Sequence, residues 1–500
     1  MLVNKITLEI FEKIQKDTNP FGKMELPKTK ITRPRKVSMI MIIKNSGVKQ
    51  LPKRLQSSFS ELKIANYLRK AGIVKGLGFS CLTVFCLIFS MVFENKNWFR
   101  LLQSSKKEDL PSKNVVYRFL NNPHYGWRNF LLAVSQNVIS KMARLTSSKR
   151  KRVLIIDDSL YSRGRSKSVE LLANVFDHTS SKFVKGFRML ALGWSDGHSF
   201  VPIDFSLLSS SKPKNRYCET SSSIDKRTHG YKRRQEAIQS TLEVVLSLVS
   251  HALKAGVQAD TILMDSWFML TPLIKSLHNE GLTVIGMVKD LNQKYIYGSK
   301  WLTLVTLKEI YKKSTPVADS SDKRILSSVI VEIEMGIRAK IVFVRNIHQK
   351  RQWLALVSTD CTLSNEEIVR TYGMRWDIET FFKVAKSYLQ LAKEFQGRSY
   401  DMMVAHTSII FTRYIVLSWE SRLNTDPKSL GELFFMMCDE VRELDYQTAL
   451  TQLLSIMNSI LTANTVEPQA LSVAEKVKTW LQQLPIYIRE KILPAVVNPF

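Results

Sequence analysis

The spacing of apolar and polar residues divides the chain into segments of different kinds. Residues 56–146 place apolar side chains at intervals of three and four, which predicts helices, and residues 400–500 return to this pattern. Between them, from 147 to 290, apolar runs of strand length alternate with helical stretches. The pattern therefore predicts an α/β protein with helical regions before and after a central sheet.

The central segment predicts elements in the order β-β-β-α-β-α-β. Its first strand is RVLIIDDSLY, and the next two strand-like runs meet at Asp196-Gly197, a dipeptide typical of hairpins. A long helix from about Tyr231 to Lys254 follows, then the strand DTILMDSW, a short helix over 270–281 and the strand LTVIGMVK. A hairpin followed by alternating helices and strands predicts a mixed sheet with helices packed on its faces.

Strand-like runs between residues 291 and 360 predict an inserted antiparallel subdomain. These runs are WLTLVTL, ILSSVIVEIEM, AKIVFVRN and QWLALVST. Ser364 and Glu367 then form an S-x-x-E capping box, in which each side chain binds the other residue's backbone N–H. The box predicts one long helix that begins there and ends at about Leu391.

The apolar stretch from Gly76 to Phe93 tests whether the chain enters a membrane. It contains no charged residue, and its length is at the lower limit for a spanning helix. Glycine, serine and threonine dilute it, and polar helical sequence follows closely. We interpret it as a buried helix, with a membrane span as the alternative.

Composition and net charge limit the classes of molecule that the protein is expected to bind. The chain has 500 residues, and its 73 Lys and Arg against 44 Asp and Glu give a net charge of +29. Nucleic acid is the leading partner for such a charge, an anionic membrane surface the second, and a merely soluble basic protein the alternative. The five cysteines are odd in number and form no C-x-x-C pair, which argues against a disulfide framework or a zinc site and fits a reducing interior.

Acidic residues fall where strands of the predicted sheet end. Asp157 and Asp158 end the first strand, Asp265 ends the fourth, and Glu379 lies in the helix after the insertion. Carboxylates gathered at one edge of a sheet repel one another unless a cation lies among them. Oxygen ligands without histidine or cysteine select a hard cation such as Mg²⁺, or Mn²⁺ in its place. Any one of these aspartates alone could be an ordinary turn residue.

The helix around Glu379 carries the most specific pattern. Tyr372, Arg375, Glu379 and Lys386 fall within about 60° of one another at about 100° per residue, so one face carries a carboxylate flanked by cations and a phenol. A salt-bridged surface helix would explain the Arg375–Glu379 pair but not the other two residues. A carboxylate between phosphate-binding cations fits chemistry on a DNA strand.

The spacing Y-x2-R-x3-E-x6-K resembles the signature of the insertion-sequence-four family of bacterial DDE transposases. The strands IIDDS and LMDSWF look like that family's first and second aspartate motifs, and the resemblance covers residues 150–395 well. It implies an α/β fold with a ribonuclease-H-like mixed-sheet catalytic core, an inserted antiparallel β subdomain, and flanking N- and C-terminal helical domains.

The sequence pattern and the resemblance together predict a division of the chain. We expect a basic flexible arm over 1–55, a helical DNA-binding domain over 56–150, and a catalytic domain over 151–395 with its β insertion at about 291–360. A C-terminal helical domain over 396–500 would serve dimerisation or DNA contact.

The family's reaction is cut-and-paste transposition. Such enzymes, assembled as dimers on terminal inverted repeats, hydrolyse a phosphodiester with two metal ions and join the freed 3′-OH to target DNA. We therefore expect a cytoplasmic, nucleoid-associated bacterial enzyme that binds double-stranded DNA and no membrane. The alternative is a catalytically inactive, domesticated transposase-derived DNA-binding protein.

The family's roles carry over to particular residues of this chain. Asp158, Asp265 and Glu379 would hold two Mg²⁺ ions, with Asp157 as the alternative to Asp158, since only one of the two neighbours can face the site. The residues expected to bind DNA are Tyr372, Arg375 and Lys386 at the cleaved end and the basic residues Lys226, Arg227, Lys232, Arg233 and Arg234 along the backbone.

Overall fold

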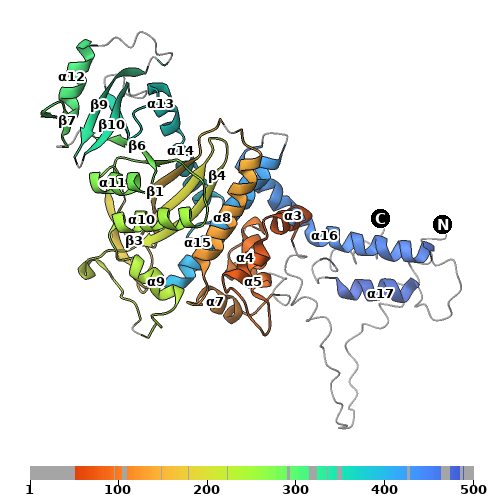
Figure 1. Cartoon of the computed structure of the whole chain (residues 1–500). Coiled ribbons are helices and arrows are strands. Elements are labelled where there is room, and N and C mark those ends of the chain that lie inside the picture. The colour runs from red at the N-terminus through yellow and green to blue at the C-terminus, as the bar shows by residue number, and fades with distance from the viewer. Residues whose placement is uncertain are drawn as a thin grey trace.

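The computed structural model places helices and strands over most of the chain (Figure 1). It describes residues 51–462, 473–484 and 488, with gaps at 95, 104–109, 148, 178–179, 222, 290–292, 315–321, 323, 335, 346–351 and 425–427. The predicted basic arm over residues 1–55 therefore lies almost wholly outside the described residues.

The centre of the molecule is a mixed sheet. β1 (Val153–Ser162), β3 (Lys182–Ser195) and β4 (Phe200–Leu208) are antiparallel neighbours in the order β4-β3-β1. β5 (Thr261–Met264) and β6 (Thr283–Val288) continue the sheet from β1 as parallel neighbours. The strands of the predicted β-β-β-α-β-α-β segment are thus present in a mixed sheet.

The hairpin expected at Asp196-Gly197 joins β3 to β4. The Asp196 carboxylate accepts hydrogen bonds from the backbone N–H groups of His198 and Ser199, at 3.0 and 2.8 Å. Gly197 has a φ of 78°, a conformation that costs little only without a Cβ. One strand, β2 (Ala173–Asp177), was not predicted, and it pairs with the first residues of β3.

The strands expected as a separate inserted subdomain instead extend the central sheet. β11 (Trp353–Ser358) pairs antiparallel with β6, and β10 (Ile337–Arg345) and β9 (Ile325–Ile333) follow. The short strands β7 (Tyr295–Tyr297) and β8 (Lys300–Leu302) complete an 11-stranded sheet among the described residues. The antiparallel pairing was predicted, but its continuity with the core was not.

Part of the first insertion strand is a helix. The run WLTLVTL was expected to be a strand, but α12 (Leu304–Ser314) begins within it. The Thr303 hydroxyl accepts a hydrogen bond from the Thr306 N–H at 3.3 Å, which caps the first turn. Leu304 and Leu307 are both buried, three residues apart, so helical spacing buries them together.

Two long helices predicted as continuous are each interrupted. The first is α9 (His229–Glu236) followed by α10 (Thr241–Lys254), because Ser240 and Glu243 form a capping box that starts a new helix. The second is α13 (Asn365–Gly373), which begins at the predicted Ser364–Glu367 box, followed by α14 (Trp376–Ser387).

Helices cover the sheet and share its core. α8 (Trp127–Arg144) and α15 (Tyr400–Leu423) lie side by side against β4, and α14 packs on β1 and β4 (Figure 1). α11 (Thr271–Asn279) packs against β6. Buried residues from the N-terminal helices, the sheet and the helices after it as far as residue 441 form one continuous hydrophobic cluster.

The remaining helices lie before β1 and after α15. The N-terminal ones are α3 (Lys53–Glu61), α4 (Ile64–Lys70), α5 (Cys81–Met91), α6 (Trp98–Leu102) and α7 (Lys113–Leu120), and the C-terminal ones are α16 (Leu430–Thr462) and α17 (Val473–Gln483). α5 is buried, as expected for the apolar stretch at 76–93. No described helix is both long enough and apolar enough to cross a membrane.

Candidate catalytic site

The register of the parallel strands brings two aspartates to one place. The pairing of β1 with β5 ends at Ile156 opposite Met264, so Asp157 and Asp265 are the next residues of the two strands. The sequence pattern predicts that β1 ends at these aspartates, but the strand continues to Ser162, paired with β3. The aspartates lie where β1 loses its parallel neighbour, which opens the edge of the sheet on that side.

Asp157 and Asp158 point to opposite faces of the sheet, as neighbours in a strand must. The Asp157 Oδ2 atom lies 3.2 Å from Nη1 of Arg375, at the start of α14. The Asp158 Oδ2 atom lies 2.6 Å from Nε of Arg188 on β3. The structure thus groups Asp157 with the helix that carries Glu379, whereas the resemblance favours Asp158.

Arg375 joins the strand to the glutamate helix. Its Nη2 atom lies 2.5 Å from the Glu379 Oε1 atom, while its other terminal nitrogen binds Asp157. Glu379 keeps 35% of its side chain exposed, whereas Arg375 and Asp157 keep only 16% and 15%. The guanidinium lies 5.8 Å from the Tyr372 ring centre, in a cation–π contact.

Lys386 completes the group on this face. Its Nζ atom donates to the Ser159 hydroxyl at 2.6 Å, and Ser159 is two residues beyond Asp157 and therefore on the same face of β1. Burial lowers the pKa of Lys386 from its usual value. Arg375 thus contacts Tyr372, Glu379 and Asp157, and Lys386 lies farther along the same face of β1, at Ser159. The predicted single helix is interrupted at Met374 and Arg375.

Burial and mutual repulsion raise the pKa values of the two aspartates, Asp157 and Asp265. Burial, together with the nearby Asp265 charge, raises the pKa of Asp157 to about 7, and Arg375 opposes the rise. Burial also raises the pKa of Asp265, with a further contribution from Asp158. Asp265 therefore lies close to both neighbours on β1, and the charged forms of these carboxylates are disfavoured where they stand.

The donor set fits a hard divalent cation by its chemistry. Asp157, Asp265 and Glu379 offer only carboxylate oxygens, and a cation would relieve the repulsion between the two aspartates. In the described part of the chain, no three His, Cys, Asp or Glu side chains stand close enough together to hold a metal ion as placed. Arg375, held between Asp157 and Glu379, supplies the neutralising charge in this arrangement.

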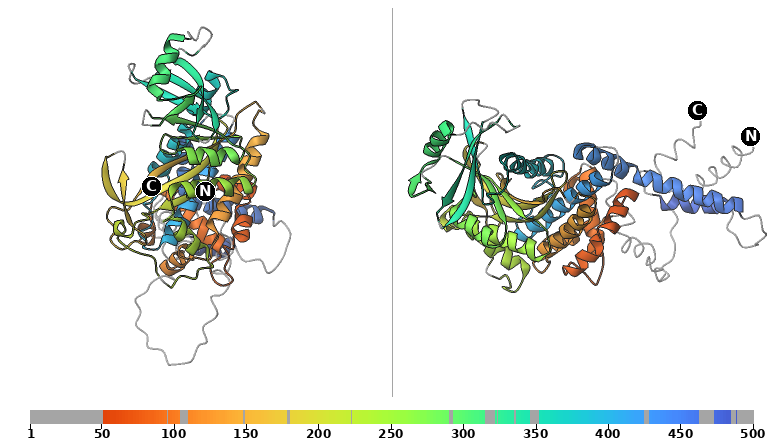
Figure 2. Two further views of the ribbon diagram at one scale, coloured as in Figure 1. Left: turned by 60° about the vertical axis from the view of Figure 1, so that its left-hand side comes forward. Right: turned by 45° about the horizontal axis from the view of Figure 1, so that its top comes forward.

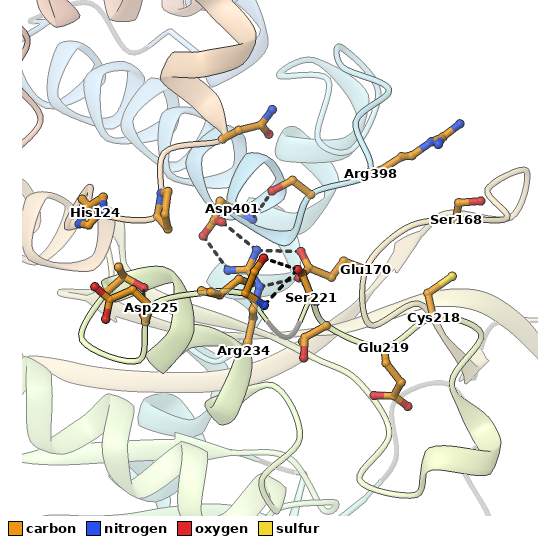
Figure 3. A pocket seen from close by; sticks show the side chains of 17 residues that line it. His124, Ser168, Glu170, Cys218, Glu219, Ser221, Asp225, Arg234, Arg398 and Asp401 are labelled. Atoms are coloured by element: carbon orange, nitrogen blue, oxygen red, sulfur yellow. Dashed lines mark hydrogen bonds and ion pairs between the residues drawn. The ribbon is translucent and has the colours of Figure 1, made fainter.

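Two of the predicted DNA-binding residues are instead buried in ion pairs. Arg234 is 3% exposed and binds Glu170 and Asp401, with nitrogen–oxygen distances of 2.7–2.9 Å (Figure 3). Arg233 is 6% exposed and lies 3.4 Å from Glu236. Their positive charges are already neutralised inside the protein, so the prediction that they contact a DNA backbone is wrong.

The other basic residues of this segment lie at the surface. Lys226, Arg227 and Lys232 are exposed, and Arg227 pairs with Asp225 at 2.8 Å. Arg234 and Asp225 both line an open polar cleft of about 780 Å³ (Figure 3). The role of Lys226, Arg227 and Lys232 in DNA binding stays a prediction.

Ser159 and Arg188 belong to the site region but were not singled out in the sequence. Ser159 could have been found, because strand alternation puts it on the face of Asp157. Arg188 could not, because its contact with Asp158 depends on the register of β1 and β3, which a single sequence does not reveal.

Two sequence families match the chain over this region. The family described as "DDE superfamily endonuclease" matches residues 108–298, and the one described as "Transposase DDE domain" matches residues 226–415. These matches support a DDE-type transposase. The first range contains Asp157 and Asp265, and the second contains Asp265 and Glu379.

Comparisons with curated proteins and solved structures add little to these matches. No curated protein matches the chain. A chain of the "Drosophila P element transposase strand transfer complex" is similar at 11% sequence identity, covering 88% of this chain and 87% of that one with a TM-score of 0.19.

Proposed function

We propose that this protein is a cut-and-paste DNA transposase of the insertion-sequence-four family. It would hydrolyse a phosphodiester at the terminal inverted repeats of an insertion sequence and then join the freed 3′-OH to target DNA. One observation carries the proposal: Arg375 links Asp157 on β1 to Glu379 on α14, at the point where Asp265 follows the adjoining strand.

The sheet supports a ribonuclease-H-like core. The order β4-β3-β1-β5-β6 has its first three strands antiparallel and its last three parallel. Helices pack on this sheet, and α14 carries Glu379, which Arg375 links to Asp157. Together with Asp265, which follows β5, this supports a site built from carboxylates of three separate parts of the sequence.

Different residues of the chain would bind the metal ions and the DNA. Asp157, Asp265 and Glu379 would hold two Mg²⁺ ions, or Mn²⁺ in their place. Bound divalent ions supply charge stabilisation for the attacking and leaving oxygens of the phosphodiester. Arg375 and Lys386 would bind phosphate oxygens of the cleaved end, and Tyr372 would contact the distorted strand. We also propose a homodimer on DNA in the bacterial cytoplasm, with residues 56–150 binding DNA and 396–500 supporting dimerisation or DNA contact.

The test uses purified full-length protein and a labelled duplex that contains the DNA flanking its gene. We expect strand cleavage at the element boundary and joining to a target duplex with Mg²⁺, and neither reaction with EDTA. Glu379→Gln should abolish cleavage, while the matched variant Glu334→Gln, at an exposed position on the sheet extension, should cut normally.

Other outcomes would contradict the proposal. Binding without cleavage in Mg²⁺ or Mn²⁺ would favour a catalytically inactive, transposase-derived DNA-binding protein. Cleavage without joining would favour a different metal-dependent nuclease. Cleavage that persists in Glu379→Gln would show that the site lies elsewhere.

A further inference from the structure

The turn between β3 and β4 contacts the start of α14, the helix that carries Glu379. The buried Ser195 hydroxyl, at the end of β3, donates to the Asp377 Oδ2 atom at 2.6 Å. Beside this contact the Met374 side chain packs against Gly197, where a Cβ would lie 3.5 Å from the methionine methyl carbon. The interruption between α13 and α14 therefore lies directly against the turn.

The register of the sheet puts Ser195 on the face that carries Asp157. Ser195 pairs with Val153 of β1. Asp157 lies four residues farther along β1, and side chains at even spacing in a strand share one face. Residues directly opposite each other in two strands also share a face, so Ser195 and Asp157 lie on the same side of the sheet. α14 crosses this side.

The start of α14 has no side-chain cap of its own. In the part of the chain that the structure describes, the N-cap residue Arg375 makes no capping hydrogen bond, and its guanidinium binds Asp157 and Glu379. Asp377 lies in the first turn of the helix, two residues after Arg375. Its contact with Ser195 therefore ties the uncapped end of α14 to the sheet.

Apolar packing fixes α14 one turn farther on. The Phe381 ring lies between Phe200 of β4 and Tyr414 of α15, with ring centres 5.4 and 4.9 Å away. Apolar contacts are not directional, so they set how closely the helix approaches the sheet but leave its first turn free to tilt and rotate. The hydrogen bond from Ser195 is directional and limits both movements.

The turn that carries Ser195 is itself fixed from the other side. The Ser195 Oγ atom accepts a hydrogen bond from the Gly197 N–H at 2.9 Å. The Asp196 carboxylate accepts from the Thr146 hydroxyl at 2.8 Å and lies 3.1 Å from the Arg422 guanidinium at the end of α15. Beyond α15, the long helix α16 extends away from the sheet (Figure 2). The turn is thus a firm support for α14.

We propose that Ser195 and Asp377 are positioning residues that hold the first turn of α14 against the sheet. Their contact keeps the Arg375 guanidinium between the Asp157 and Glu379 carboxylates. Neither residue is required to touch DNA or a metal ion. The inference rests on the proposed function, because it assigns the two residues to the same site. A displacement of about 1 Å at such a site can cost about 100-fold in rate.

The first test measures hydrogen exchange along α14 by mass spectrometry, on the full-length protein without DNA or metal. Ser195→Ala and Asp377→Ala should each speed exchange in the first turn about tenfold or more, the factor for one lost hydrogen bond to a charged group. Asp377→Asn keeps an oxygen acceptor and should retain slow exchange. Ser135→Ala is the matched control. It removes a buried hydroxyl that donates to the Leu131 and Pro202 carbonyls, and should leave exchange in α14 unchanged.

The second test measures single-turnover cleavage and DNA affinity in the same variants. Ser195→Ala and Asp377→Ala should each lower the cleavage rate by up to about 100-fold without weakening DNA binding. The double variant should lose no more than either single variant, because both remove the same contact. Asp377→Asn should recover most of the rate.

Several results would overturn the inference. One is unchanged exchange in α14 of both alanine variants, and another is faster exchange together with wild-type cleavage. Equally fast exchange of α14 in Ser135→Ala would also overturn it, because the effect would then be a general loss of stability. A wild-type protein that never cuts DNA would refute the proposed function alone, since the exchange measurement still decides whether Ser195 holds α14.

Discussion

At the scale of single residues, burial separates side chains that the sequence presents as equivalent. Arg227 and Arg234 belong to one basic cluster, yet Arg227 is exposed and Arg234 is enclosed by Glu170 and Asp401. All of the Arg234 donors point at partners, including the Gly230 carbonyl at 2.9 Å. Water can take the place of the exposed Arg227 guanidinium when that residue is substituted. Loss of the buried Arg234 guanidinium would leave two carboxylates without their cation.

Removing the Arg234 charge should therefore destabilise the fold. Arg234→Met is expected to lower the free energy of unfolding by about 3–5 kcal/mol, the cost of breaking a buried pair. Arg227→Met, the matched control, should leave it unchanged. Urea unfolding followed by circular dichroism measures both, and equal stabilities for the two variants would contradict the assignment.

At the scale of elements, the sequence predicts what local chemistry determines. The Asp196-Gly197 hairpin and the Ser364–Glu367 box are present because each depends on a few neighbouring residues. The interruption of the glutamate helix and the continuity of β11 with β6 were not predictable, because both depend on packing between distant segments. For the same reason, the sequence does not show which of Asp157 and Asp158 faces the glutamate helix, because the pairing of β1 fixes the face of each.

The cap of α13 gives a prediction at this scale. Ser364→Ala removes the hydroxyl that accepts from the Glu367 N–H at 3.1 Å, and should destabilise the protein by about 1 kcal/mol. Ser364→Asp should retain most of the stability, because aspartate also caps. Thermal unfolding of both variants measures this, and a melting temperature unchanged in Ser364→Ala would contradict a capping role.

At the scale of the whole molecule, helices from both ends of the chain share one core with the sheet. A buried cluster ties α15 to this core. Arg413 pairs with Glu394 at 2.8 Å, and His406 lies 2.6 Å from the same carboxylate. Burial lowers the pKa of His406. Burial alone would raise the pKa of Glu394, but the Arg413 charge and the other contacts outweigh it, so that pKa is lowered too.

These shifts predict how stability depends on pH. The folded state binds a proton at His406 less readily than the unfolded chain, whose histidine pKa is about 6.5. The contribution of His406 to the free energy of unfolding is therefore fully present above that pH. Below it the free energy of unfolding falls by up to about 1.4 kcal/mol per pH unit. The Glu394 contribution is lost only below the unfolded glutamate pKa of about 4.3.

His406→Gln should flatten the fall in stability between pH 7 and pH 5. The flattening will be partial, because burial also lowers the pKa values of His229 and His251. Urea unfolding at a series of pH values measures the slope. The exposed His124→Gln is the control, and an equal slope in wild type and His406→Gln would refute the assignment.

We propose that Asp157, with Asp265 and Glu379, forms the metal-dependent site that cuts DNA. The most direct measurement compares duplex cleavage by wild type, Asp157→Asn and Asp158→Asn across a range of Mg²⁺ concentrations. We expect background cleavage in Asp157→Asn at every concentration and a far smaller loss of activity in Asp158→Asn. Background cleavage in Asp158→Asn with an active Asp157→Asn would contradict it, because the site would then lie on the opposite face of β1.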